Sequence, residues 1–103
     1  MKTITLAVIS SALILTGCSS EPTIKDCMEY REIADTMMSA KQYGASTDEE
    51  LLEMAELSND DRVITIARQV VRANIFDTEF GKHAMVHTYK NGVMDRCRNS
   101  KHF

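Results

Sequence analysis

The sequence contains no tryptophan, a single proline and no run of basic residues. Its 103 residues include 12 Lys and Arg against 15 Asp and Glu, which gives a formal net charge of −3. Because a surface that binds nucleic acid needs clustered Lys and Arg, this balance argues against a nucleic-acid partner. The chain also lacks a glycine-rich phosphate loop and a serine in a G-x-S-x-G turn. We therefore expect a protein that is not an enzyme and has no catalytic residues.

An apolar run long enough to span a bilayer is also missing, since a membrane-spanning helix needs about twenty apolar residues. The longest run, residues 6–15, has about ten residues and is interrupted by Ser10 and Ser11. It follows the basic Lys2 at the start of the chain. A short positive start followed by an apolar stretch of this length is typical of an export signal.

The apolar run ends in Leu15-Thr16-Gly17-Cys18, which resembles the lipobox of bacterial lipoprotein precursors. The resemblance implies a signal peptide at residues 1–17, cleavage before Cys18, and acylation of the Cys18 thiol by a fatty acid such as palmitate. An ordinary secretory signal followed by an unrelated cysteine is the alternative. In Gram-negative lipoproteins an Asp after the lipidated Cys favours inner-membrane retention. Ser19 occupies that position here, so the resemblance implies an outer-membrane anchor facing the periplasm.

This processing sets the expected domain boundaries. Residues 18–22 are the lipidated cysteine and a short linker, and residues 23–103 form one helical domain. Removing residues 1–17, which carry one Lys and no acid, moves the net charge from −3 to −4. The four residues after Cys18 can span at most about 14 Å. Any partner of the domain must therefore lie close to the membrane surface.

With Cys18 assigned to lipid, two cysteines remain, Cys27 and Cys97. Export places them in an oxidising compartment, where two thiols in a small domain usually pair. Such a bridge closes a loop of about 71 residues, for which the chain-entropy estimate is about 4.4 kcal/mol. A free buried cysteine, or exchange with the thiol of a partner, are the alternatives. We predict the Cys27–Cys97 disulfide.

Apolar residues recur at helical spacing through the mature chain. The first predicted helix covers residues 23–43 and ends at Gly44. Thr47 and Glu50 form the capping box of a short second helix that ends near Leu57. The residues expected to face inward in these two helices are Ile24, Cys27, Tyr30, Ile33, Ala34, Met37, Met38, Leu51, Leu52, Met54 and Ala55.

The third segment, residues 62–76, is rich in β-branched side chains, which favour strands. We predict a helix there because its apolar residues share one helical face and no second strand is available to pair with it. A fourth helix, capped by Asp77 or Thr78, runs toward Cys97, with Gly92 as a candidate kink or early end. Its expected inward residues are Phe80, Ala84, Val86, Tyr89, Val93 and Cys97.

The predicted fold is therefore all-α, a small bundle of three longer helices and one short helix, tied by one disulfide. Because Cys27 begins the first helix and Cys97 ends the last, the bridge makes these two helices antiparallel neighbours. Residues 27–97 also resemble a set of small uncharacterised exported proteins of bacteria and their phages. The shared features are the two terminal cysteines, the helix end Lys41-Gln42-Tyr43-Gly44, and an acidic second helix with a Ser/Thr cap. This resemblance implies the fold and carries no activity.

Metal binding has one candidate constellation, Glu79, His83 and His87, which are spaced at i, i+4 and i+8 on one helical face. A solvated helix face produces the same spacing. The methionines, including Met37 and Met38, are a second candidate because thioethers bind Cu(I), but methionine at helical spacing is typical of core packing. We expect no cofactor.

Charge is the more informative feature. Residues 48–61 contain seven acidic residues and no basic one. Helices place acids at their starts to suit the helix dipole, which explains part of this pattern. The remainder is consistent with an acidic face that attracts a basic patch on another protein. The residues predicted to contact this partner are Glu49, Glu50, Glu53 and Glu56.

Two functions follow from these observations. The first is a membrane-anchored envelope lipoprotein without enzymatic activity, which binds a membrane-proximal envelope protein as an inhibitor, accessory subunit or exclusion factor. The alternative is an envelope metal-binding protein that uses Glu79, His83 and His87 or its methionines. A third class, the spanin-type lysis lipoprotein, is typically rich in proline, whereas this chain has Pro22 alone.

Overall fold

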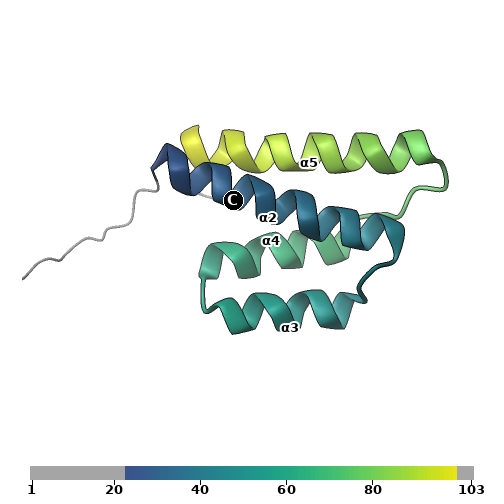
Figure 1. Cartoon of the computed structure of the whole chain (residues 1–103), viewed down its shortest axis with the longest axis horizontal. Coiled ribbons are helices and arrows are strands. Elements are labelled where there is room, and N and C mark those ends of the chain that lie inside the picture. The colour runs from purple at the N-terminus through teal and green to yellow at the C-terminus, as the bar shows by residue number, and fades with distance from the viewer. Residues whose placement is uncertain (1–22, 100–103) are drawn as a thin grey trace, which may run out of the picture.

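The computed structural model describes residues 23–99, which form four helices and contain no strand. They are α2 (Ile24–Tyr43), α3 (Asp48–Ser58), α4 (Asp61–Arg72) and α5 (Glu79–Asn99). Figure 1 shows α2 and α5 side by side along their length, with the α3–α4 hairpin on the other side of α2. The predicted all-α bundle is confirmed. The predicted signal peptide, the lipobox with Cys18 and the linker lie outside the described residues.

Two capping boxes begin the first two helices. The backbone N–H of Asp26 donates to Thr23 Oγ1, and the Thr23 N–H donates back to the Asp26 carboxylate, both at 3.1 Å. Thr47 and Glu50 exchange the same pair of bonds at 2.8 and 3.1 Å, as predicted. Each box satisfies amide groups that have no partner inside the helix. Gly44 ends α2 with a left-handed φ of 71°, which also agrees with the prediction.

The Cys27–Cys97 disulfide is present, with 5.6 Å between the two Cα atoms. It joins the start of α2 to the end of α5 and makes the two helices antiparallel neighbours, as expected. The bond lies in the interior, since both cysteines are 1% exposed. The disulfide therefore extends the apolar core to one end of the bundle.

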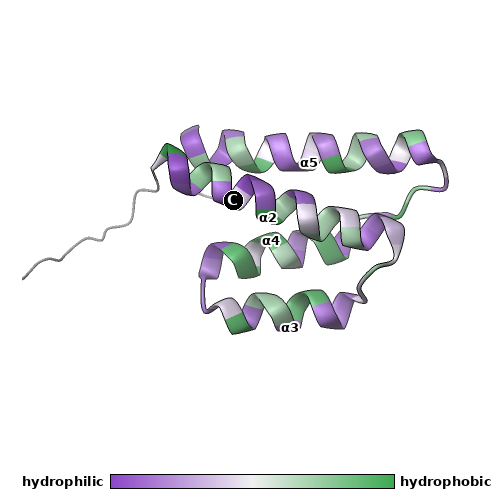
Figure 2. Cartoon of the chain, in the orientation of Figure 1, coloured by the Kyte–Doolittle hydropathy of each residue, from purple (hydrophilic) through white to green (hydrophobic). Residues whose placement is uncertain are grey.

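One core runs between the helices. In Figure 2 hydrophobic and hydrophilic residues alternate along the helices, as expected when each buries only one face. α2 contributes side chains toward both of its neighbours, because it lies between α5 and the hairpin. The buried apolar residues are Cys27, Ala34, Met37, Met38, Leu51, Ala55, Val63, Ile66, Ala67, Val70, Val86, Val93 and Cys97.

The third helix is shorter than predicted, because it ends at Arg72 and not at residue 76. A side chain of another helix fixes this end. Gln42 of α2 binds the backbone of residues 74–76, which follow α4. Gln42 Nε2 donates to the carbonyl of Asn74 at 2.7 Å, and Gln42 Oε1 accepts from the N–H of Phe76 at 3.0 Å. These bonds hold residues 74–76 in a non-helical path toward α5.

Three residues predicted to face inward are exposed. Phe80 is 84% exposed, Ile24 64% and Met54 51%. Phe80 lies six residues before the buried Val86, which on an α-helix places it about 120° away from the buried stripe. Ile24 belongs to the first turn of α2, which precedes the disulfide and the apolar core. Met54 lies beside a groove that the neighbouring helix leaves open.

Gly92 neither kinks nor ends the last helix, because α5 continues without interruption to Asn99. The helix is supported around this position on its inner side, where Val93 is fully buried. The Lys90 ammonium also binds the Asp35 carboxylate of α2 at 2.9 Å. Packing against α2 therefore outweighs the cost of about 1 kcal/mol for a glycine inside a helix.

Candidate functional site

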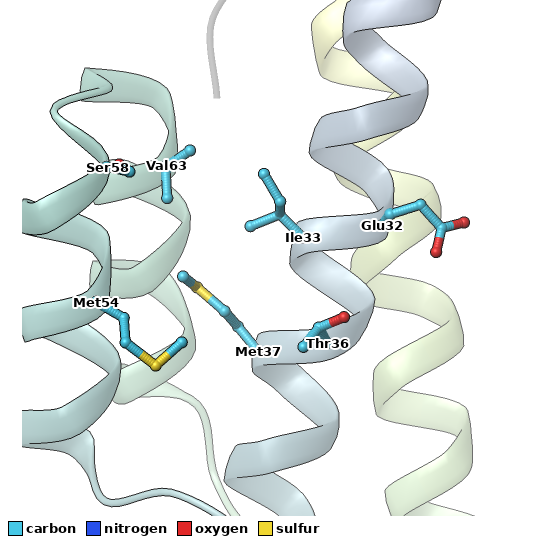
Figure 3. Close-up of a pocket in the computed structure, with 7 residues that line it drawn as sticks. All are labelled: Glu32, Ile33, Thr36, Met37, Met54, Ser58 and Val63. Atoms are coloured by element: carbon cyan, nitrogen blue, oxygen red, sulfur yellow. The ribbon is translucent and has the colours of Figure 1, made fainter.

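An apolar groove of about 340 Å³ lies between α2 and the α3–α4 hairpin. Figure 3 shows Met37 of α2 and Met54 of α3 pointing toward each other across it, with Val63 of α4 beside them. Val63 and Met37 are almost completely buried, whereas about half of the Met54 surface is exposed. The residues that line the groove are Glu32, Ile33, Thr36, Met37, Met54, Ser58 and Val63.

Contacts at both ends of the groove hold the hairpin against α2. At one end, the Tyr30 hydroxyl of α2 donates to the Asp60 carboxylate at the start of α4 at 2.8 Å. At the other end, the Lys41 ammonium of α2 binds the Asp48 carboxylate of α3 at 2.8 Å and the carbonyl of Val71 in α4 at 3.0 Å. We call these the Tyr30 clamp and the Lys41 clamp. Between them α2 and α3 stand apart, and the groove stays open.

The environment of the Tyr30 clamp also shifts the pKa of the Tyr30 hydroxyl. Burial, followed by the hydrogen bond to Asp60, raises the pKa of Tyr30. The Arg62 guanidinium lies 5.9 Å from the centre of the Tyr30 ring and opposes this shift. The phenol is therefore protonated at neutral pH and acts as a donor to Asp60. The Tyr30 hydroxyl, which is the donor in this clamp, therefore keeps its proton throughout the physiological pH range.

Exposed carboxylates lie on the two helices on either side of the groove, although Figure 3 shows the Glu32 carboxylate pointing away from the groove itself. On α2, Glu32 lines it and Glu29 lies one turn before Ile33; on α3, Glu50 and Glu53 flank Met54. All four are exposed. We call this set the acidic rim, and its members are Glu29, Glu32, Glu50 and Glu53.

The members of the acidic rim differ in whether their carboxylates already have a partner within the domain. Glu50 caps α3 through the N–H of Thr47, and Glu32 lies 3.6 Å from the Arg31 guanidinium. Both ends of that ion pair reach solvent, so it contributes little to stability. Glu53 makes no ion pair or side-chain hydrogen bond with any of residues 23–99. Its charge is therefore available to another molecule.

The structure places the four predicted partner-binding residues differently around α3. All of them are exposed, as the prediction requires. At about 100° per residue, Glu50 lies about 40° from the groove residue Met54, whereas Glu53 lies about 180° from the buried face formed by Leu51 and Ala55. Glu50 is therefore the member nearest the groove, and Glu49, Glu53 and Glu56 face solvent.

The predicted metal constellation does not form a site. Desolvation, followed by the nearby Glu79 carboxylate, raises the pKa of Tyr43. His87 Nε2 lies 3.1 Å from the side-chain amide of Asn91, and His83 is exposed. Within residues 23–99 no three His, Cys, Asp or Glu side chains form a group that could hold a metal ion. The metal-binding alternative gains no support from these side chains.

The methionine candidates are distributed between the core and the groove. Met37 and Met38 are nearly fully buried, and Met38 Sδ lies 3.7 Å from the Gln42 side-chain amide. Met54 is the groove residue on α3. Their shared property is an unbranched, adaptable side chain that fills irregular space. This is the packing role expected at helical spacing.

Sequence reasoning missed both the groove and the role of Gln42. Gln42 is 2% exposed, and its amide bonds two backbone groups of the segment before α5. The backbone carbonyl of Gln42 accepts from the Lys82 ammonium of α5 at 2.7 Å. The available signal was an amide residue on an otherwise apolar face of α2. The groove had a weaker signal, an apolar Met54 within an acidic helix.

The chain matches no protein-family model, and comparisons with curated proteins and with solved structures find no similar protein. None of the helices in residues 23–99 is long and apolar enough to cross a membrane.

Proposed function

We propose that this protein is a lipid-anchored envelope protein without enzymatic activity, which binds a membrane-proximal protein as an accessory, inhibitory or exclusion factor. The observation that carries the proposal is the groove between α2 and the α3–α4 hairpin, an apolar surface that stays open between two clamps and lies beside helices with exposed carboxylates. An open apolar groove between helices is a surface on which another protein can dock.

The electrostatics of the groove support a protein partner. Glu53 has no partner among residues 23–99, and Glu29 lies on the facing helix. Opposed charges across an interface increase the rate of encounter and exclude partners of the wrong sign. The acidic rim thus favours a partner with a basic surface.

The membrane anchor supports the same function. The lipobox resemblance places the lipid on Cys18, five residues before the described domain begins at Thr23. A linker this short holds the groove near the bilayer, which raises the effective concentration of membrane-proximal partners. Anchoring and capture are thus two parts of one proposal.

Labelling with an alkyne analogue of palmitate tests the anchor. The wild-type chain is expected to incorporate the label, a Cys18→Ala chain to incorporate none, and a Ser19→Ala chain to label as wild type. Labelling that persists in Cys18→Ala would contradict lipidation at this residue.

Photo-crosslinking in the native envelope tests capture. A photoreactive amino acid replaces Met54, which lines the groove, or, as a matched control, the exposed Asp95 of α5. We expect a discrete protein adduct from position 54 that is absent from position 95. The same pattern of adducts at both positions, or no adduct at position 54, would contradict capture through this surface.

A further inference from the structure

We propose that one edge of the α2–α5 pair, at the end that carries the disulfide, lies on the phospholipid surface of the membrane. The apolar side chains of Ile24 and Met28 enter the interface, and a basic side chain beside them meets the lipid phosphates. This inference rests on the lipid anchor of the proposed function and specifies how the anchored domain is oriented. It follows from an exposed apolar pair, the charges around it and the reach of the linker.

The apolar pair lies on the first two turns of α2. Ile24 is 64% exposed and Met28 is 55% exposed. The two residues are four positions apart, so they lie about 40° from each other around the helix. Cys27, between them in the chain, is buried and bonded to Cys97 of α5. The disulfide therefore holds the pair on a rigid support.

Hydrogen bonds show which side of the bundle the pair occupies. Arg31 follows Met28 by three residues and Ile24 by seven, which places all three on one side of α2. On this side Arg31 Nε donates to Asn91 Oδ1 of α5 at 3.3 Å. Tyr30, which clamps the hairpin, lies about 160° from Met28 around α2. The pair thus lies beside α5, on the side of α2 that is turned away from the hairpin.

A basic side chain lies at the same level as the apolar pair. Arg98 follows Asn91 by seven residues, so the two share one side of α5. Arg98 is exposed, and it comes directly after Cys97, whose disulfide places it level with the first two turns of α2. A guanidinium there can bind lipid phosphate while Ile24 and Met28 contact the boundary of the acyl chains.

The distribution of charge favours the same orientation. The carboxylates on this side of α2 are paired, since Glu32 lies 3.6 Å from Arg31 and Asp35 lies 2.9 Å from Lys90. Figure 1 shows α3 beyond α2 as seen from α5. α3 contains five acidic and no basic residues, whereas α5 contains four Lys or Arg and two Asp or Glu. An anionic surface therefore attracts the α5 edge and repels the hairpin.

The linker determines what lies opposite this edge. Ile24 is six residues after Cys18, and six residues span at most about 21 Å. With the lipid on Cys18 inserted in the bilayer, the start of α2 cannot move farther than this from the membrane surface. A bilayer is thus always within reach of the apolar pair. Its effective concentration is high enough to favour even an intrinsically weak contact.

The absence of tryptophan allows a test with a single fluorescent reporter. Met28→Trp places the reporter in the proposed contact, and Leu57→Trp places it at an apolar position of α3 that is 80% exposed. Each full chain is reconstituted in vesicles of phosphatidylcholine and phosphatidylglycerol whose brominated acyl chains quench nearby indole. We expect the emission of Met28→Trp to be blue-shifted and quenched, and that of Leu57→Trp to stay unchanged. Both variants add the same side chain, so the affinity of Trp itself for membranes does not produce the difference.

Matched charge variants test the basic residue. Arg98→Gln, added to Met28→Trp, should lower the ratio of docked to free domain about fivefold, which corresponds to about 1 kcal/mol for one basic residue near an anionic surface. Arg68→Gln removes an exposed charge from α4 and should leave the ratio unchanged. In phosphatidylcholine alone the apolar pair should still dock, and Arg98→Gln should have no effect. Equal effects of the two substitutions would contradict the role of Arg98.

The outcomes separate this inference from the proposed function. No quenching at position 28, or equal quenching at positions 28 and 57, would refute the membrane contact. So would dimerisation of the chain that Met28→Gln abolishes, because a second copy would then cover the apolar pair. A chain that incorporates the palmitate label but shows no quenching would refute only the contact. Quenching without the label would refute the anchor and leave the contact, and quenching without an envelope adduct at position 54 would refute only the capture of a protein.

Discussion

The two halves of the bundle are held together in different ways. α2 and α5 are joined along their whole length, by the Cys27–Cys97 disulfide at one end and by the bond from Lys82 to the Gln42 carbonyl at the other. The α3–α4 hairpin packs on α2 through apolar residues of α4, and two clamps hold it on either side of an open groove. The first half is thus a rigid support, and the second leaves a surface that another molecule can cover.

Between the ends, polar contacts also connect α2 with α5. Lys90 binds Asp35 at 2.9 Å, and Arg31 Nε donates to Asn91 at 3.3 Å. The middle of the α2–hairpin junction has apolar residues and the groove instead. If this contrast is correct, changes in the first half should have the larger effects on stability, and changes on the groove surface should alter binding.

The largest expected effect comes from the disulfide. Replacing both Cys27 and Cys97 by Ser should lower the free energy of unfolding by about 2–5 kcal/mol, because the unfolded chain regains the freedom that the bridge removes. Urea unfolding of the full chain measures the change, and a reducing agent applied to wild type should reproduce it. An unchanged free energy of unfolding would show that the bridge does not stabilise the α2–α5 half.

Gln42→Ala should produce the next largest effect. It leaves the carbonyl of Asn74 and the N–H of Phe76 without their side-chain partner, at about 1–3 kcal/mol for each group that stays buried. Gln42→Glu keeps an acceptor for Phe76 but places a buried carboxylate oxygen against the Asn74 carbonyl, so its loss should be at least as large. Urea unfolding measures both, and a Gln42→Ala chain as stable as wild type would contradict the two-bond account.

Much of the fold was predictable because its signals are local. The capping box of Thr47 and Glu50 and the helix end at Gly44 each depend on a few neighbouring residues. The pairing of Cys27 with Cys97 follows from the number of cysteines that remain once Cys18 is assigned to lipid. The end of α4 was not predictable, since a side chain 32 residues earlier than Asn74 decides it. The exposure of Phe80 could have been predicted, because Phe80 lies about 120° from Val86 around the helix and therefore off the buried face.

The candidate site was predictable only as a charge pattern. The acidic composition of residues 48–61 indicated α3, and one of its four proposed contacts, Glu50, lies on the same side of α3 as the groove residue Met54. The groove itself depends on the distance between α2 and α3, which the two clamps set. No local pattern encodes that distance, so the apolar half of the site could come only from the structure.

Weakening the Tyr30 clamp should have a moderate effect. Tyr30→Phe removes the hydroxyl that donates to Asp60 and keeps the ring, so the free energy of unfolding should fall by about 0.5–1.5 kcal/mol. Hydrogen exchange should rise in residues 58–64 and stay unchanged in α5. Increased exchange in α5 would show that the hairpin and the α2–α5 pair are one cooperative unit.

The smallest expected effect is a dependence of stability on pH in the α2–α5 half. The hydrogen bond from Lys90 lowers the pKa of Asp35 below its usual value of 3.8. The folded state therefore binds this proton less readily than the unfolded state, and the stabilisation present above pH 3.8 is lost as pH falls through the folded pKa. Since both side chains reach solvent, the loss should stay below about 1 kcal/mol.

Asp35→Asn checks this contribution. The variant should lose the part of the acid dependence below pH 3.8 that wild type shows in urea unfolding. Asp95→Asn, on the exposed side of α5, serves as the matched control and should retain it. Identical acid profiles for wild type and Asp35→Asn would exclude a role for the Lys90–Asp35 pair.

Hydrogen exchange of the full chain in native envelope vesicles, compared with the same chain in nanodiscs of neutral phosphatidylcholine, tests the central claim most directly. If a partner occupies the groove, the envelope should add protection to residues 29–37 of α2 and to residues 50–58 of α3. The α5 amides, which lie on the other side of α2, should exchange at the same rate in both samples. Protection added only to α5, or no added protection anywhere, would contradict capture through the groove.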